Sequence, residues 1–231
     1  MSINVFKRIE QKYIIPKDKY KILMKEISKY ITKDEYFESY ISNIYFDNSN
    51  NDLIVNSIDK PIYKDKVRLR SYGTPNLNDD IFLEIKNKYK DTVGKRRIKM
   101  TLKEFYDYLY EGKYNKESQI MNEINYLFEY YHLKPSIFIA YDRLSYKDKN
   151  DDNFRITFDN NLRSRRDDLK LEDGSKGEKF FKKEEYVIME IKTLGGIPLW
   201  FTNALSKLQI YPSSFSKYGE IYKRERMMQF A

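Results

Sequence analysis

Apolar and charged residues alternate along several segments of this chain, a pattern typical of β-strands that bury one face. In VFKRIEQKY (5–13), Ile9 and Tyr13 fall on one face, and Arg8, Glu10 and Lys12 fall on the other. The same alternation recurs in KDKVRLRSY (64–72), IFLEIKNK (81–88), VGKRRIKM (93–100), IFIAYDRLS (137–145), NFRITFD (153–159) and VIMEIKT (187–193). These segments predict strands with one apolar and one charged face.

Apolar residues at helical spacing predict helices around these strands. The segment 16–31 begins with Pro16 and places Tyr20, Leu23 and Ile27 on one side. Further helices are predicted over 101–111, 116–132, 198–208 and 214–228, and a charged loop over 167–184. Strands account for most of the rest, so the predicted fold class is α+β. No linker or repeat divides the sequence, and we expect residues 1–231 to form a single domain.

The charged faces of these strands are mostly cationic. Their basic residues are Lys12, Lys66, Arg68, Arg70, Lys86, Lys88, Lys95, Arg97, Arg143, Arg155 and Lys192, accompanied by Glu10, Glu84, Asp159 and Glu190. An antiparallel sheet with its charged face in water is one explanation. However, like charges opposite one another destabilise a sheet unless an anion lies among them. A sheet curled with this face inward would form a cation-lined tunnel, with the helices outside.

Composition narrows the candidate functions. The 231 residues include 43 Lys and Arg against 35 Asp and Glu, and the net charge of +8 favours a polyanionic partner. The absence of Cys and the single histidine, His132, exclude thiolate zinc sites and multi-histidine metal sites. No apolar run is long enough to span a membrane, and the first residues lack a signal-peptide core. We therefore expect a cytoplasmic protein.

Short sequence motifs along these strands resemble those of the VTC domain, the polyphosphate polymerase domain of the triphosphate tunnel metalloenzyme (CYTH-like) superfamily. In order, they are RIEQKY (8–13), IYFD (44–47), VRLRSYG (67–73), LEIKNK (83–88), KRR (95–97), YDR (141–143), FRITFD (154–159), MEIKT (189–193) and FSKYG (215–219). Arg8 replaces the first Glu of the superfamily's E-x-E-x-K opening, and Ser214 replaces a basic residue common in relatives. The resemblance covers nearly the whole chain.

The resemblance implies a fold and a set of site residues. The fold is a closed antiparallel β-barrel of about eight strands around a triphosphate tunnel, with helices packed outside. The implied catalytic residues are Lys12, Arg68, Arg70, Lys86, Arg143, Arg155 and Lys217. The implied substrate-binding residues are Arg8, Lys88, Lys95, Arg97, Lys192 and Ser216. Glu190 matches the family's metal ligand, and with Glu10 or Glu84 it would bind Mn²⁺ or Mg²⁺.

The implied activity is transfer of the terminal phosphoryl group of ATP to a growing polyphosphate chain. The same tunnel with water as acceptor would instead hydrolyse tripolyphosphate or an organic triphosphate. A non-catalytic polyphosphate-binding or nucleic-acid-binding protein is the alternative from another class. The sequence contains no recognised nucleic-acid-binding motif, so we expect ATP and polyphosphate as partners and no nucleic acid. Whether a separate membrane protein is also a partner stays open.

Overall fold

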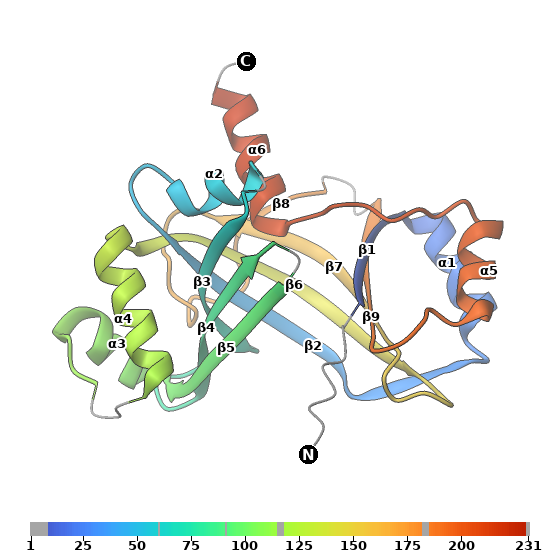
Figure 1. The fold of residues 1–231 in the computed structure, drawn as a ribbon, viewed down its shortest axis with the longest axis horizontal. Coiled ribbons are helices and arrows are strands. Elements are labelled where there is room, and N and C mark those ends of the chain that lie inside the picture. Colours follow the sequence, from blue (N-terminus) through green and yellow to red (C-terminus); the bar gives the residue numbers. More distant parts are fainter. Residues whose placement is uncertain (1–8, 60, 91, 115–117, 182–184, 230–231) are drawn as a thin grey trace. The chain divides into compact units, whose positions relative to one another are not determined.

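The computed structural model describes residues 9–59, 61–90, 92–114, 118–181 and 185–229 (Figure 1). Its strands are β1 (Ile9–Pro16), β2 (Ile31–Asp47), β3 (Tyr63–Tyr72), β4 (Asp80–Tyr89), β5 (Thr92–Thr101), β6 (Lys134–Asp148), β7 (Arg155–Arg165), β8 (Glu178–Lys179) and β9 (Tyr186–Thr193). Its helices are α1 (Lys17–Ile27), α2 (Asp52–Ile58), α3 (Leu102–Glu111), α4 (Gln119–Tyr131), α5 (Leu199–Lys207) and α6 (Lys217–Gln229).

The strands form one antiparallel sheet in the order β1-β9-β7-β6-β2-β3-β4-β5, with β8 paired to β7. The predicted α+β class is therefore confirmed. In the part of the chain that the structure describes, β1 and β5 are the two ends of this order and no pairing joins them. Closure into a barrel of about eight strands stays a prediction.

The chain divides into two compact units. Unit 1 consists of Met1–Ser39, Tyr141–Leu162 and Phe181–Phe215, and unit 2 consists of Tyr40–Ala140, Arg163–Phe180 and Ser216–Ala231. The long strands β2, β6 and β7 each contribute residues to both units. The single domain over residues 1–231 stays a prediction.

Unit 1 is built around the apolar face of β1, β9 and the first part of β7. Tyr13, Met189 and Phe158 lie side by side in register, and each is fully buried. α1 and α5 supply the other side of this core, for example through Leu23 and Phe201 (Figure 1). Because side chains alternate along a strand, the residues between these core positions belong to the opposite, polar face.

Unit 2 has the same organisation on β3, β4 and β5. Leu69 and Leu83 lie in register with Ile98, and α3 and α4 cover this apolar face (Figure 1). A capping box begins α3: the Thr101 side chain accepts from the Glu104 backbone, and the Glu104 carboxylate accepts from the Thr101 backbone. The local sequence therefore ends β5 and turns the chain back over the core.

The structure confirms the predicted helices to within a few residues, but the sequence prediction missed three elements. One is the two-residue strand β8, which lies within the segment 167–184 that was predicted as a loop. The segment 31–47 forms one long strand, β2, although its first part is charged and exposed without clear alternation. The short helix α2 was also missed. Its start is fixed by Asp47, whose carboxylate accepts hydrogen bonds from the backbone amides of Leu53 and Ile54. None of the helices in the described ranges is long and apolar enough to cross a membrane.

Candidate functional site

Three adjacent strands of unit 2 share one cationic face. β3, β4 and β5 pair in register, and every second residue of each lies on the side opposite the apolar core. We call this side the cationic face; its charged residues are Lys64, Lys66, Arg68, Arg70, Asp80, Glu84, Lys86, Lys88, Lys95, Arg97 and Lys99. The structure therefore brings together the predicted ligands of these three strands.

Like charges lie opposite one another across the cationic face. Lys86 of β4 lies between Lys66 of β3 and Lys95 of β5 in the strand register. In the next row, Glu84 lies between Arg68 and Arg97. Like charges in such positions destabilise a sheet. The row of three lysines is therefore a surface on which an anionic ligand would relieve repulsion.

Glu84 is the buried acidic centre of the cationic face. Its Oε2 atom lies 2.7 Å from Arg68 Nη2 and 4.0 Å from Arg70 Nε, and its Oε1 atom lies 3.2 Å from Lys95 Nζ. Burial alone would raise the pKa of Glu84, but the charges of Arg68, Arg70 and Lys95 outweigh it and lower the pKa to about 2. Glu84 thus holds the cations in place. The metal-binding role predicted for Glu84 stays a prediction.

Two neutral side chains of β2 complete this arrangement. The Tyr45 hydroxyl accepts a hydrogen bond of 3.1 Å from Arg68 Nη1, and Asn43 Oδ1 accepts one of 3.0 Å from Arg70 Nε. Burial would raise the pKa of Tyr45, but the charges of Arg68 and Arg70 lower it to about 8. Neither residue is among the predicted site residues. The motif IYFD contains Tyr45, but the motif alone does not show that β2 pairs with β3 and places Tyr45 opposite Arg68.

Ser216 and Lys217 lie at the start of α6 in unit 2. Lys66 Nζ donates to Ser216 Oγ over 3.1 Å, which ties the start of this helix to the cationic face. Ser216 Oγ also accepts from the Gly219 backbone amide, and Lys217 is the first helical residue. The positive end of the helix dipole therefore adds to the charge of the lysines there. The predicted Ser-Lys pair is thus connected, through Lys66, to the strand that carries the predicted phosphate ligands Arg68 and Arg70.

Glu10 and Glu190 form a carboxylate pair on the polar face of unit 1. In the strand register, Lys12 lies opposite Glu190 and Lys192 lies opposite Glu10. Lys12 Nζ is 3.7 Å from Glu10 Oε1 and 3.9 Å from Glu190 Oε2, so Lys12 lies within reach of both carboxylates. Lys192 Nζ lies 2.5 Å from Glu190 Oε1. Burial would raise the pKa of Glu190, but the charges of Lys192 and Lys12 lower it to about 2.

The two predicted arginine ligands of unit 1 both have aspartate partners. Arg143 donates to both carboxylate oxygens of Asp159, from Nε over 2.6 Å and from Nη2 over 2.8 Å. Arg155 forms an ion pair with Asp34 of β2. A phosphate at either guanidinium would have to compete with a carboxylate. The predicted phosphate-binding role of these arginines stays a prediction.

The carboxylate pair offers a hard divalent cation two carboxylates on one face, whereas Glu84 offers a single one. Glu190 is ionised at neutral pH, and it shares a face with Glu10 on adjacent strands. Mg²⁺ and Mn²⁺ bound to phosphates usually take only one or two carboxylates from the protein. No group of three or more His, Cys, Asp or Glu side chains suited to a metal occurs among the residues that the structure describes. A cation bound by Glu190 and Glu10 would therefore take its remaining ligands from a bound phosphate chain.

Other basic residues have a structural role or lie outside the described residues. Arg163 and Arg165 lie at the end of β7, and Arg166 directly follows it. Arg165 donates to the backbone carbonyls of residues 168, 170, 174 and 176 and packs on the Phe138 ring, which fixes the loop that follows β7. Arg166 binds the Glu225 carboxylate of α6. Arg8 lies outside the described residues.

Comparisons with known proteins find a matching family model, a similar sequence and similar folds. The family model of the VTC domain matches residues 7–224. Vacuolar transporter chaperone complex subunit 4 of Schizosaccharomyces pombe is 29% identical over 151 residues, which is 55% of this chain and 21% of the relative. This chain therefore matches only about a fifth of the length of that curated relative.

Two solved structures share the fold at low sequence identity. A proposed adenylate cyclase from Bacillus halodurans has a TM-score of 0.56 and 14% identity, covering 90% of this chain and 93% of the other. A proposed adenylyl cyclase from Hippeastrum, described with a dominant triphosphatase activity, has a TM-score of 0.52 and 14% identity, covering 92% and 93%. At this identity the likeness concerns the fold alone.

Proposed function

Because the chain belongs to the VTC domain family, we propose that it is an ATP-dependent polyphosphate polymerase. It transfers the terminal phosphoryl group of ATP to the end of a growing polyphosphate chain. The observation that carries this proposal is the cationic face, with its row of three opposed lysines and two arginines gathered around one buried carboxylate. A chain of phosphates supplies the regularly spaced negative charge that such a surface needs.

The residue types of the cationic face suit this substrate. Arg68 and Arg70 present planar guanidinium groups whose orientation is fixed by Glu84 and Asn43. A guanidinium binds two phosphate oxygens at once, whereas a lysine ammonium is a mobile point charge. Fixed arginines would hold one phosphate in place while the lysines follow the rest of the chain. This division supports a polymeric product.

Phosphoryl transfer requires alignment and charge neutralisation more than covalent help from the protein. The bond between the terminal phosphorus of ATP and its bridging oxygen breaks, and a bond forms to the terminal oxygen of the polyphosphate chain. The electron pair of the broken bond leaves with ADP. The accepting phosphate is already ionised, so no general base is needed. The cations neutralise the charge on the phosphates.

Glu190 and Glu10 would hold the divalent cation, Mg²⁺ or Mn²⁺. When bound, this cation supplies further neutralisation of the phosphate oxygens. Lys12 lies within ion-pair distance of both carboxylates and Lys192 of Glu190, and these two cations lower the pKa of Glu190. We assign Glu84 to the positioning of Arg68 and Arg70, in place of the metal-binding role.

Incubation of the purified protein with ATP and Mg²⁺ or Mn²⁺ tests the polymerase. We expect ADP and long-chain polyphosphate in matching amounts of phosphoryl groups, measured by a coupled ADP assay and a polyphosphate-stained gel. Inorganic phosphate without polymer, at every ratio of metal to ATP, would place the enzyme among triphosphate hydrolases. Binding of tripolyphosphate without any ADP would place it among non-catalytic binding proteins. A cytoplasmic location and a separate membrane partner that receives the product are further parts of the proposal.

A thermal melt tests the cationic face directly. At a concentration 100 times the dissociation constant, tripolyphosphate should stabilise the protein by about 2.7 kcal/mol, which raises Tm by about 5–11 °C. Lys86→Met should weaken binding about tenfold, because it removes the middle charge of the lysine row while keeping an apolar stem. At the same ligand concentration the stabilisation then falls to about 1.4 kcal/mol.

Lys99→Met is the matched control for Lys86→Met. Lys99 lies on the same face but is paired with Asp80, and its Nζ lies 2.6 Å from Asp80 Oδ2. We expect this variant to retain nearly the whole tripolyphosphate shift when ionic strength is matched with NaCl. Equal losses in the two variants would mean that the ligand responds only to net charge, and the cationic face would then not be a specific site.

A further inference from the structure

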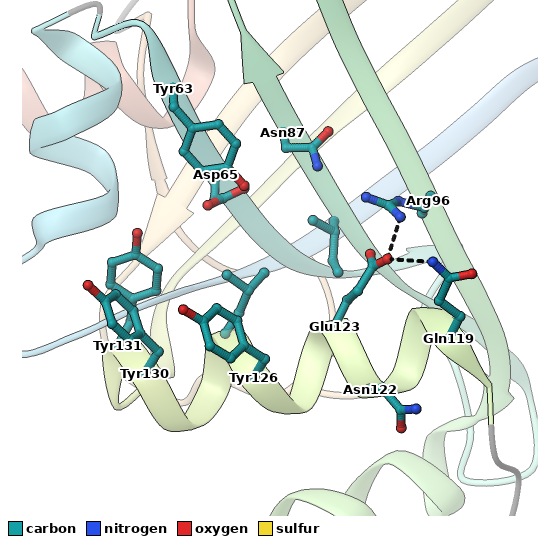
Figure 2. Close-up of a pocket in the computed structure, with 12 residues that line it drawn as sticks. Tyr63, Asp65, Asn87, Arg96, Gln119, Asn122, Glu123, Tyr126, Tyr130 and Tyr131 are labelled. Carbon is teal, nitrogen blue, oxygen red and sulfur yellow. Dashed lines mark hydrogen bonds and ion pairs between the residues drawn. The ribbon is translucent and has the colours of Figure 1, made fainter.

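A pocket of about 600 Å³ lies in unit 2 between α4 and the strands β3, β4 and β5 (Figure 2). Its lining belongs to the side of these strands opposite the cationic face, because Asp65, Asn87 and Arg96 alternate with the lysines and arginines along each strand. The phosphate-binding residues proposed above do not line this pocket. It therefore offers a site separate from the proposed reaction.

One end of the pocket combines tyrosine rings with a buried carboxylate. Figure 2 shows Tyr63 and Asp65 on the strands at the same end of the pocket as Tyr130 and Tyr131 of α4, with Tyr126 between these tyrosines and Glu123. Tyr126 and Tyr130 are 61% and 63% exposed, and their rings stack at 5.5 Å. Large aromatic rings held in the open at a pocket are available to a ligand.

Asp65 is the charged group at this end. Only 4% of its surface is exposed, and its Oδ1 atom accepts a hydrogen bond of 2.9 Å from the Tyr63 hydroxyl. Among the residues that the structure describes, no basic side chain forms an ion pair with Asp65. Burial raises its pKa, as expected for a carboxylate removed from water without a cationic partner. A bound cation would supply that partner.

The basic group in the pocket is engaged elsewhere. Arg96 pairs with Glu123 of α4, and Gln119 Nε2 donates to the same carboxylate over 3.5 Å (Figure 2). This cluster lies at the other end of the pocket from Asp65. The tyrosine end therefore has a net negative charge in an otherwise basic protein. The faces of a tyrosine ring also attract cations, because the π electrons give each face a partial negative charge.

We propose that the tyrosine end of this pocket binds an alkylammonium group, with Asp65 as its counter-ion and Tyr63, Tyr126 and Tyr130 as the surrounding rings. Gly94 of β5 helps to form the site, because a Cβ atom there would lie 2.1 Å from Asn87 Oδ1 and would displace that side chain. The ligand is either a free polyamine or a lysine side chain, which share this chemistry. The site lies across the sheet from the cationic face, so tripolyphosphate does not occupy it.

Titrations followed by backbone amide NMR test this site. The probes are spermidine and Nα-acetyl-lysine methylamide, with n-butanol as the neutral control and NaCl to match ionic strength. We expect saturable shifts at residues of α4 and around Asp65 with at least one ammonium probe, and the tighter probe identifies the source. The shifts should persist in the presence of tripolyphosphate. The proposal is overturned if butanol binds as tightly as both amines, or if neither amine gives saturable shifts.

Two variants sharpen the test. Asp65→Asn keeps an acceptor for the Tyr63 hydroxyl but removes the charge, and it should weaken ammonium binding about tenfold. Tyr130→Leu removes an exposed ring and should weaken it about threefold or more. Tyr110→Leu is the control, because Tyr110 is 72% exposed on α3 and does not line the pocket. If Asp65→Asn fails to fold, unchanged binding by Tyr130→Leu would by itself refute the site.

Discussion

The Glu190→Gln variant is expected to synthesise polyphosphate about 100-fold more slowly than the unaltered protein, or slower still. Glutamine keeps the size of the side chain and removes the charge that would bind a divalent cation. The carboxylate is ionised at neutral pH, because Lys192 and Lys12 lower its pKa to about 2 despite burial. Its loss also leaves two lysines without their shared partner. The measurement is ADP formation at saturating ATP over a range of Mn²⁺ concentrations.

Glu26→Gln is the matched control for the Glu190 variant. Glu26 Oε1 lies 2.5 Å from Lys207 Nζ, so this variant also breaks a lysine–glutamate pair of unit 1, away from the polar face. We expect it to keep nearly full turnover. Electron paramagnetic resonance of Mn²⁺ should show weaker metal binding in Glu190→Gln and unchanged binding in Glu26→Gln. A Glu190→Gln enzyme with more than a tenth of normal turnover would show that the metal is held elsewhere.

The sequence predicts the strands that alternate cleanly and fails where alternation is absent. β3, β4, β5 and β9 follow their predicted ranges closely, since part of each strand has apolar residues at every second position, as in Val67 and Leu69 or Ile98 and Met100. The first part of β2 carries charges and the exposed Tyr36 instead, so its strand structure depends on pairing with other strands. Likewise, α2 depends on Asp47, whose carboxylate binds the first amides of the helix. The spacing of apolar residues, with a period of two or 3.6, reveals neither the pairing of distant strands nor a capping contact.

The same limit applies to the candidate site. Alternation places Arg68, Glu84 and Lys86 on polar faces, and the structure shows that they share one. Alternation does not indicate which charges become partners. The Asp34–Arg155 pair joins residues 121 positions apart, and the Arg143–Asp159 pair joins two neighbouring strands. Tyr45 likewise receives its lowered pKa from arginines of another strand.

The two units differ in how their charges are compensated. On the polar face of unit 1, Lys12 and Lys192 contact Glu10 and Glu190, and the two arginines contact aspartates. On the cationic face of unit 2, several basic residues gather around Glu84. The balanced set is suited to holding a cation, and the unbalanced set to holding an anion. The proposed metal-assisted phosphoryl transfer would need a ligand of each charge.

Removal of that central carboxylate should expose how strongly the cations repel one another. The pKa of Glu84 falls from an ordinary 4.5 to about 2 in the folded protein. A difference of about 2.5 units corresponds to about 3 kcal/mol of stability at neutral pH. Glu84→Gln should therefore lower Tm at pH 7 by about 6–12 °C. Tripolyphosphate should restore much of this loss, because its charges replace the missing carboxylate.

The pH dependence gives the decisive control for Glu84→Gln. Because the folded-state pKa lies below the unfolded-state value, the stabilisation from Glu84 is fully present above about pH 4.5 and is lost as the pH falls towards 2. Unfolding by urea at pH 7 and at pH 3 should therefore show a difference between the two proteins that narrows with acidification. Glu111→Gln, which removes an exposed partner of Lys113, should change stability by less than about 1 kcal/mol at either pH. An equally stable Glu84→Gln protein at pH 7 would show that Glu84 does not hold the cationic face together.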